Sequence, residues 1–283
     1  MEIHQAIAAA VSTLGLQRLD AQLLLLHALG RPAQDRAWLL AHDHDALPPK
    51  TVRDFMQLAQ RRSTGVPLAY LIGQHEFYGL LLVVDARVLD PRPDTEVLVD
   101  WALDLLPGHT AATGTQPSEV IDLGTGSGAI ALALKHTRPD LQVSAVDASA
   151  DALAVAQANA RRLGLAVRFL QGNWLCGIEQ RFDLIIANPP YIAEDDTHLA
   201  QLVHEPRQAL VSGPDGLDAI RTIVAQAGSY LKPGAWLLLE HGWDQATAVR
   251  DLLQQTGFAQ VQSRRDLAGI ERCSGGRWSY PPQ

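Results

Sequence analysis

An amide side chain, two prolines and an aromatic ring follow one another at Asn188-Pro189-Pro190-Tyr191, directly after the apolar run 184–187. A short, branched apolar run predicts a buried strand of a parallel sheet. The prolines end that strand because they donate no hydrogen bond to a neighbour, and Pro189 restricts Asn188 to an extended conformation. Ligands bind outside the carboxyl ends of strands in open α/β sheets, so a stiff binding loop is expected here.

The loop suits chemistry at a planar amino nitrogen, which is a poor nucleophile because its lone pair is conjugated. The side-chain oxygen of Asn188 and the main-chain oxygen of Pro189, or a neighbouring one, can accept the two N–H hydrogens and stabilise developing positive charge. Tyr191 can pack against the planar group. Such orientation can supply ~7–11 kcal/mol, whereas a general base adds only ~10²–10⁴-fold. Adenine and a glutamine side chain share this geometry, so the loop alone does not separate them.

A second chemical stretch is the glycine-rich segment 122–128, which lies between a predicted strand and a predicted helix. Its glycines allow a tight turn and let a ligand approach the backbone amides at a helix start. Asp147 ends the next predicted strand, where a carboxylate can accept both hydroxyls of a ribose. Asn173 and Trp174 follow the third strand and suit an adenine ring. The glycines also fit the dinucleotide fingerprint, but no hydride-transfer residues accompany them.

Composition bounds the class of protein. The chain has 283 residues, which favours about two domains. Its net charge of −8 and its pI near 5.6 do not favour a nucleic-acid partner. Two cysteines and ten scattered histidines indicate neither a disulfide framework nor a metal site, and the segment 42–45 is interpreted as a solvated loop. No apolar run is long enough to span a membrane. A cytoplasmic protein without a bound metal is expected.

The predicted fold is α/β, with a doubly wound, mostly parallel Rossmann-like sheet whose final strand is antiparallel. Residues 1–65 are predicted to form a small helical domain, residues 66–93 a β-hairpin linker, and residues 94–283 the main domain. The hairpin is assigned to residues 70–73, 77–80 and 82–84. Residues 107–118 are predicted to form a loop. The predicted strands are 120–123, 143–146, 167–170, 184–187, 235–240, 258–263 and 271–279, and the predicted helices of this domain are 96–106, 129–136, 150–163, 217–231 and 245–255.

The glycine segment, Asp147 and the Asn-Pro-Pro-Tyr loop together resemble the class I S-adenosylmethionine-dependent methyltransferases that act on planar amino nitrogens. The chain as a whole resembles one family of them, the peptide chain release factor glutamine methyltransferases (HemK/PrmC). The sharpest mark is Pro-Arg-Pro-Asp-Thr-Glu at 91–96, from which a sister family that methylates a ribosomal-protein glutamine departs. The other similar stretches are 76–79, 122–128, 188–191, 204–207, 213–217 and 266–272.

The resemblance implies the cofactor, the substrate and the roles of individual residues. The cofactor would be S-adenosylmethionine, and the substrate would be the glutamine of the Gly-Gly-Gln loop in class 1 release factors. The residues implied to bind the cofactor are Gly124, Thr125, Gly126, Ser127, Gly128, Asp147, Asn173, Trp174 and Asn188. Those implied to bind the glutamine are Asn188, Pro189, Pro190, Tyr191 and Phe77, with Asn188, Pro189 and Tyr191 catalytic. Arg92, Thr95 and Glu96 would brace the site or fix the domain junction.

Two positions depart from the family pattern. Asp90 stands where the family has an aliphatic residue, which puts the packing of the hairpin in doubt, and Asn173 stands where the family often has Asp. Asn173 can still accept a hydrogen bond from an adenine amino group, so cofactor binding is expected to survive. The helical domain, which carries no chemical residues, is expected to dock the release factor, and the protein is expected to be a monomer.

Two further readings stay open from the sequence. One is an adenine-specific methyltransferase acting on DNA or RNA, which the acidic balance disfavours because phosphate contacts need cationic side chains. The other is a silent S-adenosylmethionine-binding module acting through protein contacts, which an intact Asn188 disfavours.

Overall fold

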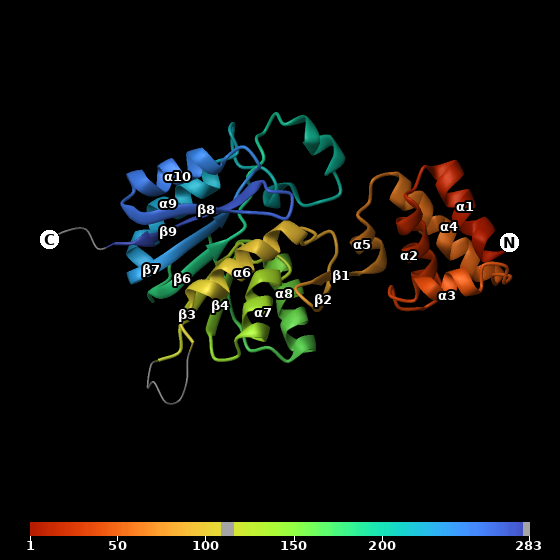
Figure 1. Ribbon diagram of the computed structural model, residues 1–283, viewed down its shortest axis with the longest axis horizontal. Coiled ribbons are helices and arrows are strands. Elements are labelled where there is room, and N and C mark those ends of the chain that lie inside the picture. The colour runs from red at the N-terminus through yellow and green to blue at the C-terminus, as the bar shows by residue number, and fades with distance from the viewer. Residues whose placement is uncertain (109–115, 280–283) are drawn as a thin grey trace. The chain divides into compact units, whose positions relative to one another are not determined.

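The computed structural model describes residues 1–108 and 116–279 (Figure 1). Residues 109–115, within the predicted loop 107–118, lie outside the described residues. The chain forms two compact units, one of residues 1–74 with 201–204 and one of residues 75–200 with 205–283. No helix among the described residues is long and apolar enough to cross a membrane.

The first unit, the helical unit, contains five helices around an apolar core. They are α1 (Ile3–Leu14), α2 (Arg18–Ala28), α3 (Arg36–Ala41), α4 (Pro49–Ser63) and α5 (Leu68–Ile72). The core forms because apolar side chains recur every three or four residues, so that Leu24 and Leu25 of α2 meet Phe55 of α4 with no exposed surface. Residues 201–204 belong to this unit, where His204 Nε2 lies 3.0 Å from the Thr64 carbonyl oxygen.

One prediction at the end of this unit was wrong. Residues 70–72 were assigned to a β-hairpin, but they lie in α5, because Pro67 favours a helix start and Gly73, with φ of 79°, ends the helix. The hairpin is shorter and consists of β1 (Gln74–Phe77) and β2 (Leu80–Val83). The predicted domain limits themselves stay a prediction.

The second unit, the α/β unit, is built on a seven-stranded sheet in the order β5-β4-β3-β6-β7-β9-β8. Its strands are β3 (Glu119–Leu123), β4 (Gln142–Asp147), β5 (Arg168–Gln171), β6 (Phe182–Ala187), β7 (Leu231–Glu240), β8 (Phe258–Arg265) and β9 (Glu271–Trp278). The strands from β3 to β7 are parallel, and β9 pairs antiparallel with β7 and with β8. The predicted fold, including the antiparallel final strand, is confirmed.

Helices cover both faces of this sheet, as repeated βα units require. They are α6 (Glu96–Leu105), α7 (Ala129–Thr137), α8 (Ala150–Leu163), α9 (Asp218–Tyr230) and α10 (Ala246–Gln255), with short 3₁₀ turns at Pro93–Thr95, Thr197–Gln201 and Arg207–Ala209. Figure 1 shows α6, α7 and α8 on one side of the sheet and α9 with α10 on the other. Apolar residues from β3, β6 and β7 form one core with α9 and α10. Because these strands are buried on both faces, their carboxyl ends are held rigidly.

The hairpin is fastened to the α/β unit by a buried amide. Asn159 in α8 accepts a hydrogen bond from the Val83 N–H (2.8 Å) and donates to the carbonyl oxygens of Val83 (2.9 Å) and Ser127 (3.0 Å). Ser127 belongs to the glycine segment. One side chain therefore ties β2 and that segment to the same helix.

Candidate active site

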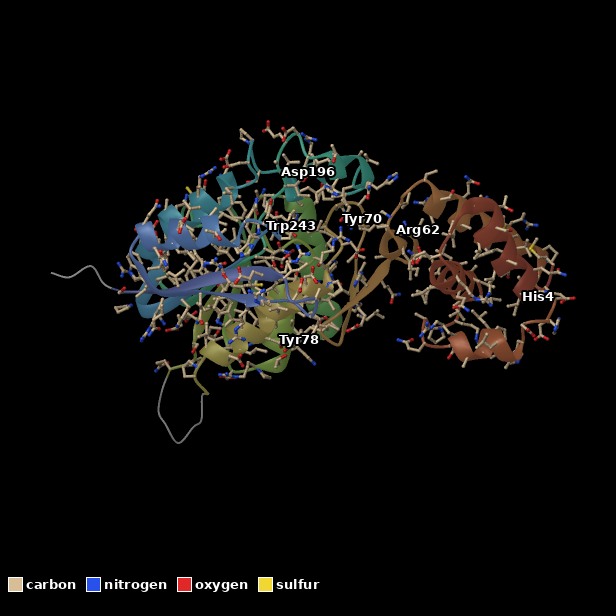
Figure 2. All side chains as sticks on the ribbon, turned by 45° about the horizontal axis from the view of Figure 1, so that its top comes forward. His4, Arg62, Tyr70, Tyr78, Asp196 and Trp243 are labelled. Carbon is tan, nitrogen blue, oxygen red and sulfur yellow. The ribbon has the colours of Figure 1, made fainter. Side chains whose placement is uncertain are left out.

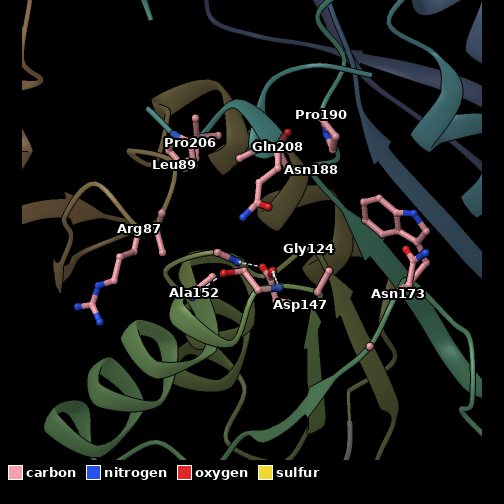
Figure 3. A pocket seen from close by; sticks show the side chains of 17 residues that line it. Arg87, Leu89, Gly124, Asp147, Ala152, Asn173, Asn188, Pro190, Pro206 and Gln208 are labelled. Carbon is pink, nitrogen blue, oxygen red and sulfur yellow. Dashed lines mark hydrogen bonds between the residues drawn. The ribbon is translucent and has the colours of Figure 1, made fainter. Parts of the chain in front are cut away.

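A cleft opens at the carboxyl ends of β3, β4, β5 and β6, where the sequence predicted binding (Figure 3). It holds about 750 Å³ of space free of protein atoms, part of it open to solvent. Gly124 and Gly126, Asp147, the pair Asn173 and Trp174, and Asn188 all line this cleft. Four strands thus bring residues from distant parts of the sequence to one place. Figure 3 shows Asn188 and Pro190 on one side of the cleft, with Gly124 and Asp147 opposite.

The Asp147 carboxylate is oriented by the backbone around it. Its Oδ2 accepts from the Gly126 N–H (2.9 Å) and its Oδ1 accepts from the Ser149 N–H (2.9 Å). An ionised carboxylate accepts about four hydrogen bonds, so both oxygens keep capacity for ligand hydroxyls. The carboxylate is half-buried at the end of β4, next to the start of α8.

The glycine loop leaves room for a flat ring. Gly124 has φ of 72°, and a methyl group there would lie 3.3 Å from the Trp174 ring, so only glycine allows this approach without displacing that ring. Trp174 itself has φ of 53°, an uncommon conformation for a residue of its size. Strain of this kind is typical of functional sites.

The floor of the loop contains a buried acid. Asp122 accepts a hydrogen bond from the Thr125 hydroxyl (2.6 Å), and burial raises the pKa of Asp122 to about 7. The Thr125 side chain therefore faces Asp122 rather than the cleft. Thr125, Ser127 and Gly128 do not line the cleft, and their predicted contacts with the cofactor stay predictions.

The Asn-Pro-Pro-Tyr loop is held from three sides. Asn188 Nδ2 donates to the Thr95 hydroxyl oxygen (3.1 Å), the Tyr191 hydroxyl donates to Glu240 Oε1 (3.3 Å), and the Tyr191 carbonyl accepts from Gln245 Nε2 (3.0 Å). Burial, with the nearby charge of Glu240 as the next cause, raises the pKa of Tyr191, so its hydroxyl stays protonated at neutral pH.

Glu240 is the acid that the sequence prediction missed. It ends β7 with 1% of its surface exposed, and burial raises its pKa to about 7. Its position gives the same signal as Asp147, namely an acidic residue at the carboxyl end of a predicted parallel strand. Thr95 is also buried, at 4% exposure, and directly precedes α6.

The remaining predicted residues lie at several places. Pro190 lines the cleft, whereas Pro189, Tyr191 and Phe77 do not. Phe77 is 1% exposed at the end of β1, so its contact with substrate stays a prediction. Glu96 accepts a hydrogen bond from the Tyr78 N–H (2.9 Å) and so anchors the hairpin.

Asp90, the departure from the family pattern, is buried in a charge network. Its Oδ1 lies 2.6 Å from His75 Nδ1, and its Oδ2 lies 3.8 Å from Arg92. Arg92 pairs with buried Glu205 at 2.5 Å. An imidazole and a guanidinium group therefore replace the apolar packing that an aliphatic residue would give at this position.

A group of possible metal ligands lies on the helical unit. Ligand atoms of Glu2, His4 and His44 lie within 4.8 Å of one another, and the sequence did not predict this group. His42, from the segment read as a solvated loop, instead stacks on Trp38 at 4.3 Å. The predicted absence of a metal site stays a prediction.

Both units match known protein families. Residues 4–73 match the PrmC N-terminal domain, and residues 98–216 match the methyltransferase small domain. The release factor glutamine methyltransferase of Bordetella pertussis is 52% identical over 266 residues, which cover 93% of this chain and 95% of that protein. The protein of the same name from Xylella fastidiosa (strain Temecula1) is 47% identical over 272 residues, which cover 95% of this chain and 96% of that protein.

The α/β fold is shared with more distant methyltransferases. The structure of the Thermus thermophilus 16S rRNA N2 G1207 methyltransferase, in complex with AdoMet and guanosine, superposes with a TM-score of 0.52 at 18% identity. The match covers 72% of this chain and 49% of that one, and at this identity it concerns the fold alone.

Proposed function

The chain belongs to the release factor glutamine methyltransferase family, and from that premise we propose that it methylates the side-chain amide nitrogen of a glutamine in peptide chain release factors. The glutamine is that of the Gly-Gly-Gln motif of class 1 release factors. The observation that carries the proposal is the Asn188–Tyr191 loop at the end of β6, whose first side chain faces the cleft that Gly124 and Asp147 line.

S-adenosylmethionine is the cofactor, and the cleft fits it. Asp147 presents oriented carboxylate oxygens to ribose hydroxyls, and Asn173 with Trp174 presents an amide and a flat ring to adenine. Gly124 keeps the floor free of side-chain atoms. When bound, the cofactor supplies a methyl group on a positively charged sulfur.

The loop increases the low nucleophilicity of the glutamine amide nitrogen by fixing the orientation of the amide group. The Asn188 Oδ1 and the Pro189 carbonyl accept the two N–H hydrogens, which turns the nitrogen lone pair out of conjugation and stabilises charge as it develops. Tyr191, buried and fixed by Glu240, packs against the planar group. The amide nitrogen would bond the methyl carbon as the carbon–sulfur bond breaks, with the electron pair of that bond left on a neutral thioether sulfur. The nitrogen would give up one proton to solvent, and no dedicated base is needed.

Mass spectrometry of the release-factor loop peptide tests the proposal. Incubation of purified release factor with this protein and S-adenosylmethionine should add one methyl group, located on the glutamine of Gly-Gly-Gln. Tritiated S-adenosylmethionine offered with release factor, DNA and RNA together tests the adenine alternative. Label on nucleic acid alone would overturn the proposal, and label on nothing would favour a silent binding module.

The proposal also covers the role of the helical unit, the cellular compartment and the oligomeric state. We propose that the helical unit docks the body of the release factor while the α/β unit receives the glutamine. The division of labour is supported by the match of residues 4–73 to the PrmC N-terminal domain. Because release factors act on ribosomes, the protein is proposed to act in the cytoplasm, as a monomer and without direct contact with nucleic acid.

A further inference from the structure

Two side chains of the reaction loop are connected to one buried acid. The Tyr191 hydroxyl donates to Glu240 Oε1 at 3.3 Å. Hydrogen bonding from the Thr95 side chain is among the causes that lower the pKa of the same carboxyl group. Thr95 in turn accepts from Asn188 Nδ2 at 3.1 Å. Glu240 therefore contacts Tyr191 directly and reaches Asn188 through one hydroxyl.

The direction of these hydrogen bonds follows from the chemistry of each group. Above about pH 7 the Glu240 carboxyl group is ionised and only accepts, so the Thr95 hydroxyl uses its single proton toward Glu240. The Thr95 oxygen then offers Asn188 only lone pairs, and the Asn188 amide must turn its NH₂ group to them. Its Oδ1, the acceptor that the substrate amide needs, is left for the reaction. If the Asn188 carboxamide were rotated by half a turn, its NH₂ group would face the N–H donors of the substrate amide.

We propose that Glu240 and Thr95 are positioning residues for the methyl transfer, which fix the orientation of the Asn188 carboxamide and the Tyr191 ring. The proposal rests on the proposed function of the Asn188–Tyr191 loop. Neither residue touches the substrate, and both act through the side chains that do. Polarisation along the connected hydrogen bonds also makes the Asn188 oxygen a better acceptor.

The position of Glu240 is costly for stability, which argues against a purely structural role. The carboxyl group is fully buried, and among the described residues its Oε2 has no hydrogen-bond partner. Buried acids of this kind are often less stabilising than an apolar residue of similar size. Glu240 instead ends a strand next to β6, where the Tyr191 hydroxyl of the reaction loop reaches it.

Thr95→Val and Thr95→Ser test the connection to Asn188. Valine keeps the shape and removes the hydroxyl, so kcat for release-factor methylation should fall roughly 10- to 100-fold, as expected for one or two lost hydrogen bonds to a reacting group. KM for release factor and the Kd for S-adenosylmethionine should stay within about threefold, since only the oriented state is lost. Serine restores the hydroxyl and should recover most of the rate.

Thr222→Val is the matched control, because Thr222 is exposed on α9 and donates only to the Asp218 carbonyl of its own helix. It should leave kcat unchanged. A general loss of packing in Thr95→Val would instead raise the Kd for the cofactor and would not be corrected by serine. Full activity of Thr95→Val, or failure of Thr95→Ser to recover it, overturns the proposal.

Double-mutant cycles test Glu240 as the shared partner. Glu240→Gln replaces the charged carboxylate with a neutral amide that has a single, weaker acceptor oxygen, and Tyr191→Phe removes one of the two hydroxyl donors. Each change should lower kcat, and combining Glu240→Gln with Thr95→Val or with Tyr191→Phe should cost less than the product of the single effects. Fully multiplicative losses would show that Glu240 acts elsewhere. Glu179→Gln, at an exposed position, is the control for the chemical change.

The wild-type protein separates this inference from the proposed function. If it adds no methyl group to release factor, the proposed function fails and the kinetic comparison has no basis. If it methylates the glutamine while the Thr95 and Glu240 variants keep wild-type kcat, the function stands and the positioning role is wrong.

Discussion

The two units of this protein have cores of different chemistry. Among the described residues, the helical unit buries only apolar side chains. Figure 2 shows the side chains of both units, with His4 and Arg62 labelled on the helical unit. The α/β unit buries thirteen polar or charged residues, and four of them, Thr95, Asp122, Thr125 and Glu240, lie in or beside the reaction site. Burial of polar atoms costs free energy unless each finds a partner. The α/β unit buries polar side chains at the reaction site, where their hydrogen bonds orient the reacting groups. The helical unit orients no reacting groups and, among its described residues, buries no polar side chains.

The largest effect should come from removing the oriented amide itself. Asn188→Ala deletes an acceptor that holds the reacting nitrogen, and we expect turnover to fall by at least about 1000-fold, the upper end for loss of one such group. The protein should fold normally, because only the bond to Thr95 is lost. Initial rates with tritiated cofactor measure the effect, and calorimetry of cofactor binding serves as the control. Unchanged turnover would place the chemistry elsewhere in the chain.

Substitution of two equally buried phenylalanines, one in each unit, can distinguish the roles of the two units. Phe55 on α4 and Phe182 on β6 are both fully buried. Each change to alanine should cost about 3–5 kcal/mol of stability through the cavity it leaves. Phe55→Ala should leave cofactor binding intact but weaken activity on whole release factor more than on a loop peptide. Phe182→Ala should weaken cofactor binding as well.

Thermal unfolding with and without S-adenosylmethionine gives the measurement for this pair. The cofactor should raise the transition of the α/β unit in Phe55→Ala, since a ligand stabilises only the state that binds it. Equal loss of cofactor binding in both variants would contradict an independent helical unit.

A buried amide should matter for stability rather than for turnover. Asn159→Ala removes three hydrogen bonds that hold Val83 and Ser127 and should cost about 3 kcal/mol. Urea unfolding of the variant measures this, with Gln254→Ala at an exposed position of α10 as the control. The kcat per folded molecule should change far less than in Asn188→Ala, although both changes delete one asparagine amide.

The pH dependence of stability should reveal the buried acid of the site. Burial raises the pKa of Glu240 from 4.5 to about 7, with Asp94 raising it and Thr95, Tyr191 and Arg272 lowering it. Between these pH values the folded state keeps a proton that the unfolded chain has lost. The contribution to stability is therefore full below pH 4.5 and is lost as the pH rises to about 7, a fall of roughly 3 kcal/mol.

Unfolding free energies of wild type and Glu240→Gln across this range test the pH prediction. The difference between the two proteins isolates Glu240, because burial also raises the pKa of Asp122 to about 7 and adds its own fall in both. Parallel curves would show that Glu240 is ionised in the folded protein throughout.

Much of the fold could be predicted from local patterns. The helix 150–163 was predicted with its observed limits, because Ser149 caps its start and Gly164, with φ of 67°, ends it. The strand 184–187 is part of β6, which begins two residues earlier. The sequence pattern was less decisive where a short apolar segment can form either a helix or a strand. Tyr70 was predicted to lie in a strand, but it lies in α5.

The site was predictable only in part, for a physical reason. Asp147 and Asn188 could be identified from the sequence, because each is a polar residue that ends an apolar run. The bonds between Asn188 and Thr95 and between Tyr191 and Glu240 join residues far apart in the chain, so no local pattern contains them. Sequence therefore located the reacting groups, whereas the structure was needed to find what orients them.

The return of residues 201–204 to the helical unit limits how these units can be exchanged between relatives. A chimera joined only at residue 74 would separate His204 from the Thr64 carbonyl it contacts. The tetrapeptide Gln-Leu-Val-His must travel with the helices it belongs to, even though it lies between the reaction loop and α9 in the sequence. A chimera that exchanges the helical unit therefore needs two replacements, one of residues 1–74 and one of residues 201–204.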